Sequence, residues 1–254
     1  MAKKSTGSIQ KRRYLKHFWF RILAFVLASI SVCAVAFHFA INDGNDAFYF
    51  VDSQYKHVQS RFVTEKTASL QSTIEYPITK NTAVTATIAD AIDTASREFI
   101  EQAHQPALRT EPFTQNISYQ VPYNNKHYMS IVVTIYQDSH GAHPVSQALY
   151  WTFDMHTGKA VTTAELLGNS LDGMARILMQ IKRAVRTKVV QHGGVADDEF
   201  LDELITPSAI SMFTVIDRHT VEFPFGKGVV AAESDGPISV RLSTDSLQLF
   251  LQNT

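Results

Sequence analysis

Three histidines near the middle of the chain have the spacing that comes nearest to a metal site. His140 and His143 are three residues apart, and His156 follows one predicted hairpin later, close to Asp154. Two histidines at such a spacing, with a third ligand, can bind zinc and leave one coordination position open for a water molecule. This set would support a metal-assisted hydrolase.

The surroundings of the histidines favour a simpler interpretation. The segment from Gln137 to Pro144 is broken by glycine and proline, so it is expected to be a loop rather than a helix that would fix two imidazole rings. No glutamate stands beside the pair to act as a base. We therefore predict no metal and no cofactor, and we expect His143 to hydrogen-bond the backbone. The loop then forms a predicted binding surface, made of His140, Gly141, Ala142, His143 and Pro144.

Other catalytic groups are missing from the sequence as well. The single cysteine, Cys33, lies inside an apolar run, and no serine stands in a nucleophile elbow, so covalent catalysis has no candidate. Asp154 ends a T-F-D stretch and is explained as a turn former. Tyr150 and Trp151 can stack on sugar rings or anchor a protein partner, although core packing accounts for at least one of them. We predict a binding protein rather than an enzyme.

Two predicted strands must position these residues. Met129 to Tyr136 is apolar and β-branched nearly throughout, which is typical of a strand covered on both faces. Ala148 to Phe153 is its aromatic partner, and Asp154 to Lys159 closes the hairpin region as a tight turn. Ile74 to Ile78 is predicted to be an edge strand, because Pro77 has no N–H to donate.

Two amphipathic helices complete the pattern. Thr87 to Gln105 has an apolar stripe with Thr87 as its expected N-cap, and Leu171 to Val190 has a second stripe. The outer face of the second helix is basic; such a face is usually just solvated, and the alternative is contact with anionic polymers or lipid headgroups. Its cations are Arg176, Lys182, Arg183, Arg186 and Lys188. The predicted fold class is α+β, an antiparallel sheet with helices packed on one face.

The charge distribution is uneven along the chain. The net charge is −1, but residues 1–41 hold seven of the 23 basic residues and no acid, which leaves 16 basic against 24 acidic residues in the rest. Phosphate binding needs clustered Lys and Arg on the binding face. We therefore predict that the body does not bind nucleic acid.

The N-terminal segment is predicted to anchor the chain in a membrane. Residues 22–41 are almost wholly apolar and match the roughly 20 residues that cross a bilayer. The basic residues before them favour a cytoplasmic N-terminus, with the C-terminal domain extracytoplasmic. One alternative is a signal peptide cleaved after Ala34–Ala36, but the apolar run continues beyond that site. Another is a lipoprotein modified at Cys33, but Val32 is bulky at a position where a small residue is needed. In either case the body leaves the cytoplasm.

These observations predict four segments. Residues 1–21 are a basic cytoplasmic tail, and residues 22–41 are one N-terminal transmembrane helix of a single-pass protein of the cell membrane. Residues 42–73 are a juxtamembrane stalk or helix, because some apolar residues there fall at helical spacing. Residues 74–254 are a single α+β extracytoplasmic domain.

Several short motifs of this body occur in a known order. They are Ile74-Glu75-Tyr76-Pro77, Tyr128-Met129-Ser130-Ile131, Gly141-Ala142-His143-Pro144, Phe153-Asp154-Met155-His156-Thr157-Gly158-Lys159 and Val221-Glu222-Phe223. With them the body resembles the extracytoplasmic domain of RsiV-type anti-sigma factors, which is also the module N-terminal to the catalytic domain of PdaC-type peptidoglycan deacetylases. The resemblance spans roughly Ile74 to Leu251.

The resemblance implies a domain of unknown function that faces the cell wall or binds lysozyme. Residues 1–21 are too short and too polar to hold a sigma factor, and no deacetylase catalytic domain follows in this sequence. We therefore expect an envelope binding or sensor module that recognises a wall component or an extracellular protein such as lysozyme. The alternative from another class is the metal-assisted hydrolase, acting on cell-wall polymer. Transmembrane signalling through residues 1–21 is a third hypothesis.

Overall fold

The computed structural model describes residues 46–106, 111–167, 171–195, 197–206, 210–231 and 236–243; of 46–52, Leu167 and Leu171 only the backbone is described. Apart from Asp46, these residues belong to one compact unit, Ala47–Thr254. The predicted cytoplasmic tail and transmembrane segment, residues 1–41, lie outside them. Among the described residues, none of the helices has both the length and the apolar character needed to cross a membrane.

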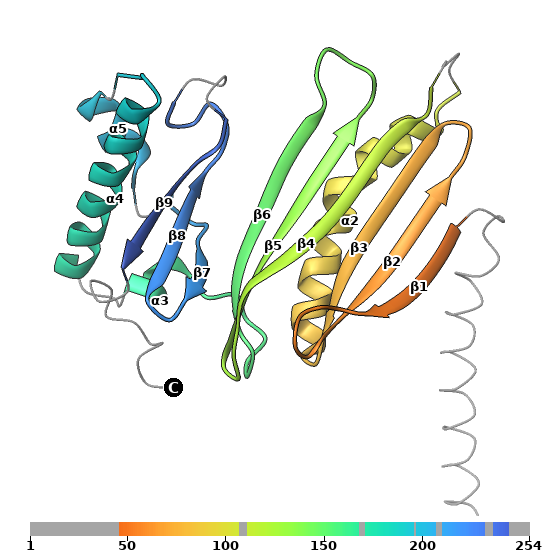
Figure 1. Ribbon diagram of the computed structural model, residues 1–254, viewed down its shortest axis with the longest axis horizontal. Coiled ribbons are helices and arrows are strands. Elements are labelled where there is room, and N and C mark those ends of the chain that lie inside the picture. Colours follow the sequence, from red (N-terminus) through yellow and green to blue (C-terminus); the bar gives the residue numbers. More distant parts are fainter. Residues whose placement is uncertain are drawn as a thin grey trace, which may run out of the picture. The chain divides into compact units, whose positions relative to one another are not determined.

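A six-stranded sheet forms the first part of this unit (Figure 1). Its strands follow one another in chain order, and the pairs from β2 to β6 are antiparallel except for β3 with β4, which are parallel. The parallel pair is joined by helix α2, a β-α-β crossover. The elements are β1 (Asp46–Asp52), β2 (Val58–Lys66), β3 (Leu70–Thr79), α2 (Thr82–His104), β4 (Phe113–Asn124), β5 (Tyr128–Asp138) and β6 (Val145–Asp154).

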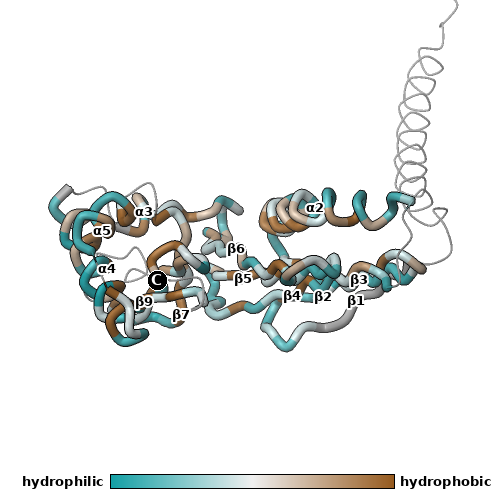
Figure 2. The backbone as a smooth tube through the Cα atoms, turned by 90° about the horizontal axis from the view of Figure 1, so that it is seen from above, coloured by the Kyte–Doolittle hydropathy of each residue, from teal (hydrophilic) through white to brown (hydrophobic). Residues whose placement is uncertain are grey.

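Helix α2 covers one face of this sheet. Figure 2 shows it as a separate layer against the strands. Its stripe at helical spacing is fully buried, together with alternate residues of the central strands, because one face of a strand repeats every second residue. The most deeply buried members of this core are Val84, Ile88, Ile92, Ile117, Met129, Ile131, Val133, Ile135 and Phe153.

The start of α2 differs from the prediction. The helix begins five residues before Thr87, and Asn81 is its N-cap, accepting a hydrogen bond from the backbone N–H of Ala83 at 3.0 Å. Thr87 lies inside the helix, where its hydroxyl donates to the Ala83 carbonyl. The prediction missed the first turn because T-A-V-T-A carries only one strongly apolar residue, Val84.

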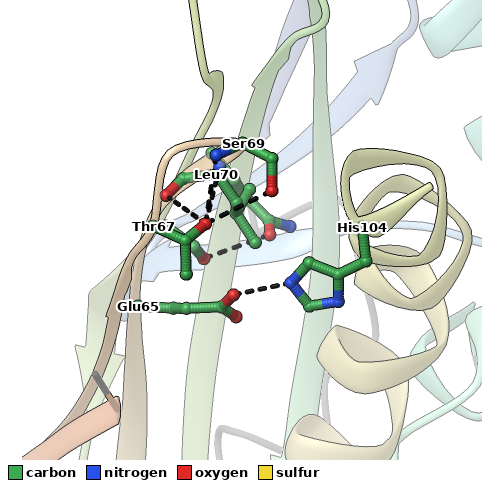
Figure 3. Close-up of polar contacts among 7 residues, drawn as sticks. Glu65, Thr67, Ser69, Leu70 and His104 are labelled. Carbon is green, nitrogen blue, oxygen red and sulfur yellow. Dashed lines mark hydrogen bonds and ion pairs between the residues drawn. The ribbon is translucent and has the colours of Figure 1, made fainter. Parts of the chain in front are cut away.

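The far end of α2 is tied to the hairpin between β2 and β3. His104, in the last turn, lies 2.6 Å from the Glu65 carboxylate of β2, as Figure 3 shows. The turn itself is closed by the Thr67 hydroxyl, which accepts from the backbone N–H groups of Ser69 and Leu70. Contacts at both ends therefore fix α2 along the sheet.

Strands stand where a juxtamembrane helix was expected. The prediction of a stalk or helix over residues 42–73 is wrong for β1 and β2, and β2 pairs along its whole length with β3. The sequence of β2 contains Phe62, Val63 and Thr64, whose β-branched and aromatic side chains favour strands. Pairing with β3 outweighs the partial helical spacing of the apolar residues.

The prediction of an edge strand at Pro77 needs a correction. β3 lies inside the sheet, but its parallel pairing with β4 covers only Leu70–Ile74. Pro77 lies beyond that stretch and has β2 as its one paired neighbour, so its missing N–H breaks no ladder bond on the other side. The strand is internal at one end and an edge at the other.

A second, three-stranded sheet forms the rest of the unit, where the sequence predicted only one sheet. It consists of β7 (Thr214–Asp217), β8 (Thr220–Phe225) and β9 (Ile238–Ser243), all antiparallel, in that order. Helix α4 (Leu171–Gln191) packs on it with α3 (Thr163–Leu167) and α5 (Asp198–Leu204). Mixed α+β architecture with mostly antiparallel sheets is confirmed, but the helices and strands make two cores.

The two sheets are joined where β7 meets the face of the first sheet opposite α2. The Ser130 hydroxyl of β5 accepts a hydrogen bond from the backbone N–H of Val215 at 3.1 Å and shares another with Thr152 of β6 at 2.7 Å. Ser130 and Thr152 are both fully buried. β5 is therefore covered on both faces near its start only, since Thr134 and Tyr136 on the same face are exposed.

Candidate binding site

The predicted loop between β5 and β6 is held in place by His140. This residue has a left-handed backbone (φ 59), its N–H donates to the Asp138 carboxylate, and its Nε2 donates to the Pro112 carbonyl at 2.9 Å. Its Nδ1 lies 3.7 Å from the Glu111 carboxylate. The imidazole thus ties the loop to the segment before β4, which is a structural role.

The remaining loop residues are exposed. Gly141, Ala142, His143 and Pro144 are all on the surface, and the hydrogen bond expected from His143 to the backbone is not among those of the described residues. His156 lies beyond the other end of the ten-residue strand β6, about 30 Å along the chain direction. The three-histidine metal set is therefore not formed, and no group of three metal-binding side chains is found among the described residues.

Tyr150 and Trp151 point to opposite faces of the first sheet, because they are neighbours on β6. Trp151 stacks on Phe153, with ring centroids 6.3 Å apart, and packs against the α2 core. Tyr150 lies on the other face, where burial and the nearby Glu222 carboxylate raise the pKa of its phenol. The two aromatic side chains do not form one platform for a sugar ring.

The tight turn after β6 presses against the beginning of α2. Asp154 accepts hydrogen bonds from the backbone N–H groups of His156 and Thr157; burial opposes ionisation, but these bonds lower the pKa of the carboxyl. Gly158 (φ 75) is buried so closely that an added Cβ would lie 2.8 Å from the Asn81 Oδ1. Asn81 in turn donates to the Met155 carbonyl at 3.1 Å. The motif that ends β6 therefore positions the N-terminus of α2.

A cavity of about 660 Å³ opens beside this N-terminus. Met129, which is fully buried, and Met155 give it an apolar part, while its polar lining comes from short connections between elements. Those polar residues are Lys56, His57, Lys80, Asn81, Thr82, Asn124, Asn125 and Lys126. We name this cavity the lysine cavity.

The strand order explains why these connections meet. β2 begins, β3 ends, β4 ends and β5 begins at the same end of the sheet, which is the lower end in Figure 1. Lys56, Lys80 and Lys126 follow or precede those strand ends by one or two residues. The lysine cavity is thus assembled from three separate turns.

The turns themselves are ordered by hydrogen bonds. The Asn125 side chain accepts from the backbone N–H groups of His127 and Tyr128, and the Asn124 amide donates to the Lys56 carbonyl at 2.7 Å. His57 holds a left-handed conformation (φ 63), which is uncommon for residues other than glycine but more frequent for histidine than for most of them. The asparagines therefore fix the turns. Lys56, Lys80 and Lys126 are exposed, and among the described residues none of them forms an ion pair.

The electrostatics of the lysine cavity favour an anion. Three lysines line it, and no Asp or Glu is among its lining residues. The N-terminus of a 23-residue helix adds the positive end of the helix dipole, and the first turn of α2 carries no acidic residue. An anionic group with an apolar part beside it would match both the charge and the methionines.

No single stretch of the sequence points to the lysine cavity. The lysines are 24 and 46 residues apart, and each is an ordinary surface residue by itself. A signal existed in the repeated pairing of lysine with asparagine or histidine in strand-end turns, at Lys56-His57, Lys80-Asn81 and Asn125-Lys126. Only the parallel β3–β4 crossover, however, brings these turns to the same end of the sheet.

Comparison with known proteins agrees with part of this chain. Residues 63–146 match the family model described as deacetylase PdaC. The match runs from within β2 to the start of β6 and so contains α2 and two of the three lysine-bearing turns. This is the PdaC side of the resemblance stated above. No curated protein matches the chain.

Two solved structures share the fold. One is a member of the DUF3298 family from Bacteroides fragilis, with a TM-score of 0.50, 11% identity, and coverage of 80% of this chain and 93% of that chain. The other is a DUF3298 family protein from Pseudomonas aeruginosa, with a TM-score of 0.54, 10% identity, and coverage of 81% and 93%. At these identities the likeness extends to the fold alone. The RsiV part of the resemblance stays a prediction.

Proposed function

We propose that this protein is a membrane-anchored binding module of the cell envelope, and that its extracytoplasmic domain recognises an anionic wall component. The observation that supports this function is the lysine cavity, with its three cations and no acidic lining residue. Anchoring through residues 22–41 is the sequence-based part of the proposal.

The wall is a suitable source of such a ligand. Peptidoglycan peptides carry carboxylates, which lysine amines and backbone N–H groups at a helix N-terminus bind well. The apolar part at Met129 and Met155 can contact the carbon skeleton of the same fragment. The predicted loop at His140–Pro144 lies at the opposite end of β5 and β6, so it does not belong to this site.

Recognition without reaction fits the described residues better than hydrolysis. The hydrolase hypothesis needs His140, His143 and His156 together, and β6 separates the first two from the third. The non-enzyme assignment itself remains a prediction of the sequence.

Equilibrium binding of a soluble muropeptide to the full chain in detergent micelles tests the proposal. Replacing Lys80 and Lys126 by glutamine should weaken binding about tenfold, since two partly screened charged contacts are lost. The matched control replaces Lys66 and Arg97, two exposed cations outside the cavity, and should bind as the wild type does.

The same fragment with its carboxylates amidated should bind weakly to every variant. A parallel titration with lysozyme tests whether the ligand is instead a protein. Binding of lysozyme but not of the muropeptide would move the proposal to a protein partner, and absence of binding to both would overturn it.

A further inference from the structure

A second cavity lies between helix α4 and strand β9 of the second sheet. It is a groove of about 750 Å³. Figures 1 and 2 show α4 running alongside β9. The α4 residues that line it follow the pattern i, i+3, i+4, i+7, i+8, i+11 and so lie on one face of the helix. They are Gln180, Arg183, Ala184, Thr187, Lys188 and Gln191. We name this the α4–β9 groove.

The opposite wall of the α4–β9 groove is the edge of a strand. Among the described residues, β9 pairs with β8 alone. Four consecutive residues, Ser239 to Leu242, line the groove. Successive side chains of a strand point to opposite faces of the sheet. Four consecutive residues can therefore line the same groove only if the groove runs along the edge of the strand. Val240 and Leu242 are buried in the core, while Arg241 is exposed.

The charge of the α4–β9 groove is positive. Arg183, Lys188 and Arg241 line it, against a single acid, Glu222. The Glu222 carboxylate accepts hydrogen bonds from Ser239 Oγ at 2.7 Å and from Arg241 Nε at 3.2 Å, so it is already partly neutralised.

Two other cations of α4 form ion pairs with α5 instead of lining the groove. Lys182 and Arg186 form ion pairs with Asp202 and Asp198 of α5. Within the described part of the chain no ion pair involves Arg183 or Lys188. The basic face expected from the sequence is therefore divided: one side binds α5, and the other faces the groove.

We propose that the α4–β9 groove binds an extended acidic peptide, which adds to β9 as a further strand. An exposed strand edge offers unpaired backbone N–H and C=O groups, and an extended peptide satisfies them while alternate side chains enter the neighbouring groove. Acidic side chains on the helix-facing side meet Arg183 and Lys188. This site is separate from the lysine cavity, and its occupant is a polypeptide.

The test uses a fluorescein-labelled heptapeptide of alternating glutamate and valine, titrated into the full chain in detergent micelles. The full chain should bind it, and Arg183→Glu should weaken binding about tenfold or more, because an attractive charge becomes a repulsive one. Arg176→Glu is the matched control: it makes the same charge change on an exposed position of α4 outside the groove, and should bind as the wild type does. Lys188→Glu serves in the same way if the Arg183 variant does not fold.

The heptapeptide with all backbone nitrogens methylated separates strand addition from charge alone. It keeps the side chains but cannot donate to β9, and should bind about tenfold more weakly. Hydrogen exchange at Ser239–Leu242 should slow only with the unmodified peptide. Equal binding of the two peptides, equal loss in the Arg176 and Arg183 variants, or no binding to the wild type would each overturn the proposal.

Discussion

Replacing Gly158 by alanine tests how the turn after β6 supports the lysine cavity. Gly158 has φ 75, and a Cβ there would lie 2.8 Å from Asn81 Oδ1 and 2.9 Å from the Ala83 Cβ. Both neighbours belong to the beginning of α2, where Asn81 caps the helix. The substitution should therefore strain the turn and push it away from the helix.

The expected loss has two parts. A left-handed backbone costs a non-glycine residue roughly 1–2 kcal/mol, and overpacking of a close contact adds roughly 1–3 kcal/mol. Gly193→Ala isolates the first part, because Gly193 has φ 81 and nothing lies within 4 Å of an added Cβ. We expect Gly158→Ala to exceed Gly193→Ala by about 1–3 kcal/mol in the free energy of unfolding.

Urea unfolding of the full chain, followed by tryptophan fluorescence, measures both variants. The m-value should stay unchanged, so that midpoints compare stabilities directly. Muropeptide affinity should fall in Gly158→Ala and stay at the wild-type value in Gly193→Ala. Equal destabilisation by the two substitutions would refute the close packing of the turn on Asn81.

Three further predictions concern single side chains. Asp154→Asn should destabilise the fold at neutral pH, because the carboxylate accepts hydrogen bonds in the turn. The folded pKa of Asp154 is lowered, so the stabilisation by its carboxylate is complete above about pH 4 and disappears as the pH falls through the folded pKa. Unfolding curves of both proteins over a series of pH values will show this. Thr162→Ala should cost about 1 kcal/mol in thermal unfolding, because Thr162 and Glu165 form a capping box at the start of α3, with bonds of 2.7 and 3.2 Å. Thr214→Val should be neutral or raise the unfolding midpoint, because the buried Thr214 hydroxyl has no hydrogen-bond partner among the described residues; clear destabilisation would contradict this.

The sequence predicted elements with strong local patterns. β5 and β6 were found from their nearly continuous β-branched and aromatic runs, and α2 and α4 from apolar residues that recur every three to four residues. The turn at Asp154–Lys159 was found because its residue types favour turns. β1 and β2 were missed because some apolar residues of this stretch fall at helical spacing, whereas pairing of β1 with β2 and of β2 with β3 decides their conformation. The division into two sheets depends on long-range contacts, because the apolar pattern of a strand does not show which sheet it joins.

The candidate site could not be predicted in the same way. The predicted residues His140 and Trp151 have structural roles, as a loop tie and as part of the core. Lys56, Lys80 and Lys126 have no pattern in the chain, since their common position follows from the strand order alone. The local sequence thus predicted the turn at Asp154–Lys159, whereas the lysine cavity forms only because the strand order brings three distant turns together.

Lysine labelling in the presence of ligand tests the lysine cavity most directly. The full chain is treated with acetic anhydride, with and without a saturating soluble muropeptide, and each lysine is quantified by mass spectrometry. The muropeptide should slow labelling of Lys56, Lys80 and Lys126 and leave that of Lys66 unchanged. Equal labelling of the three cavity lysines with and without a bound muropeptide would contradict the proposed site.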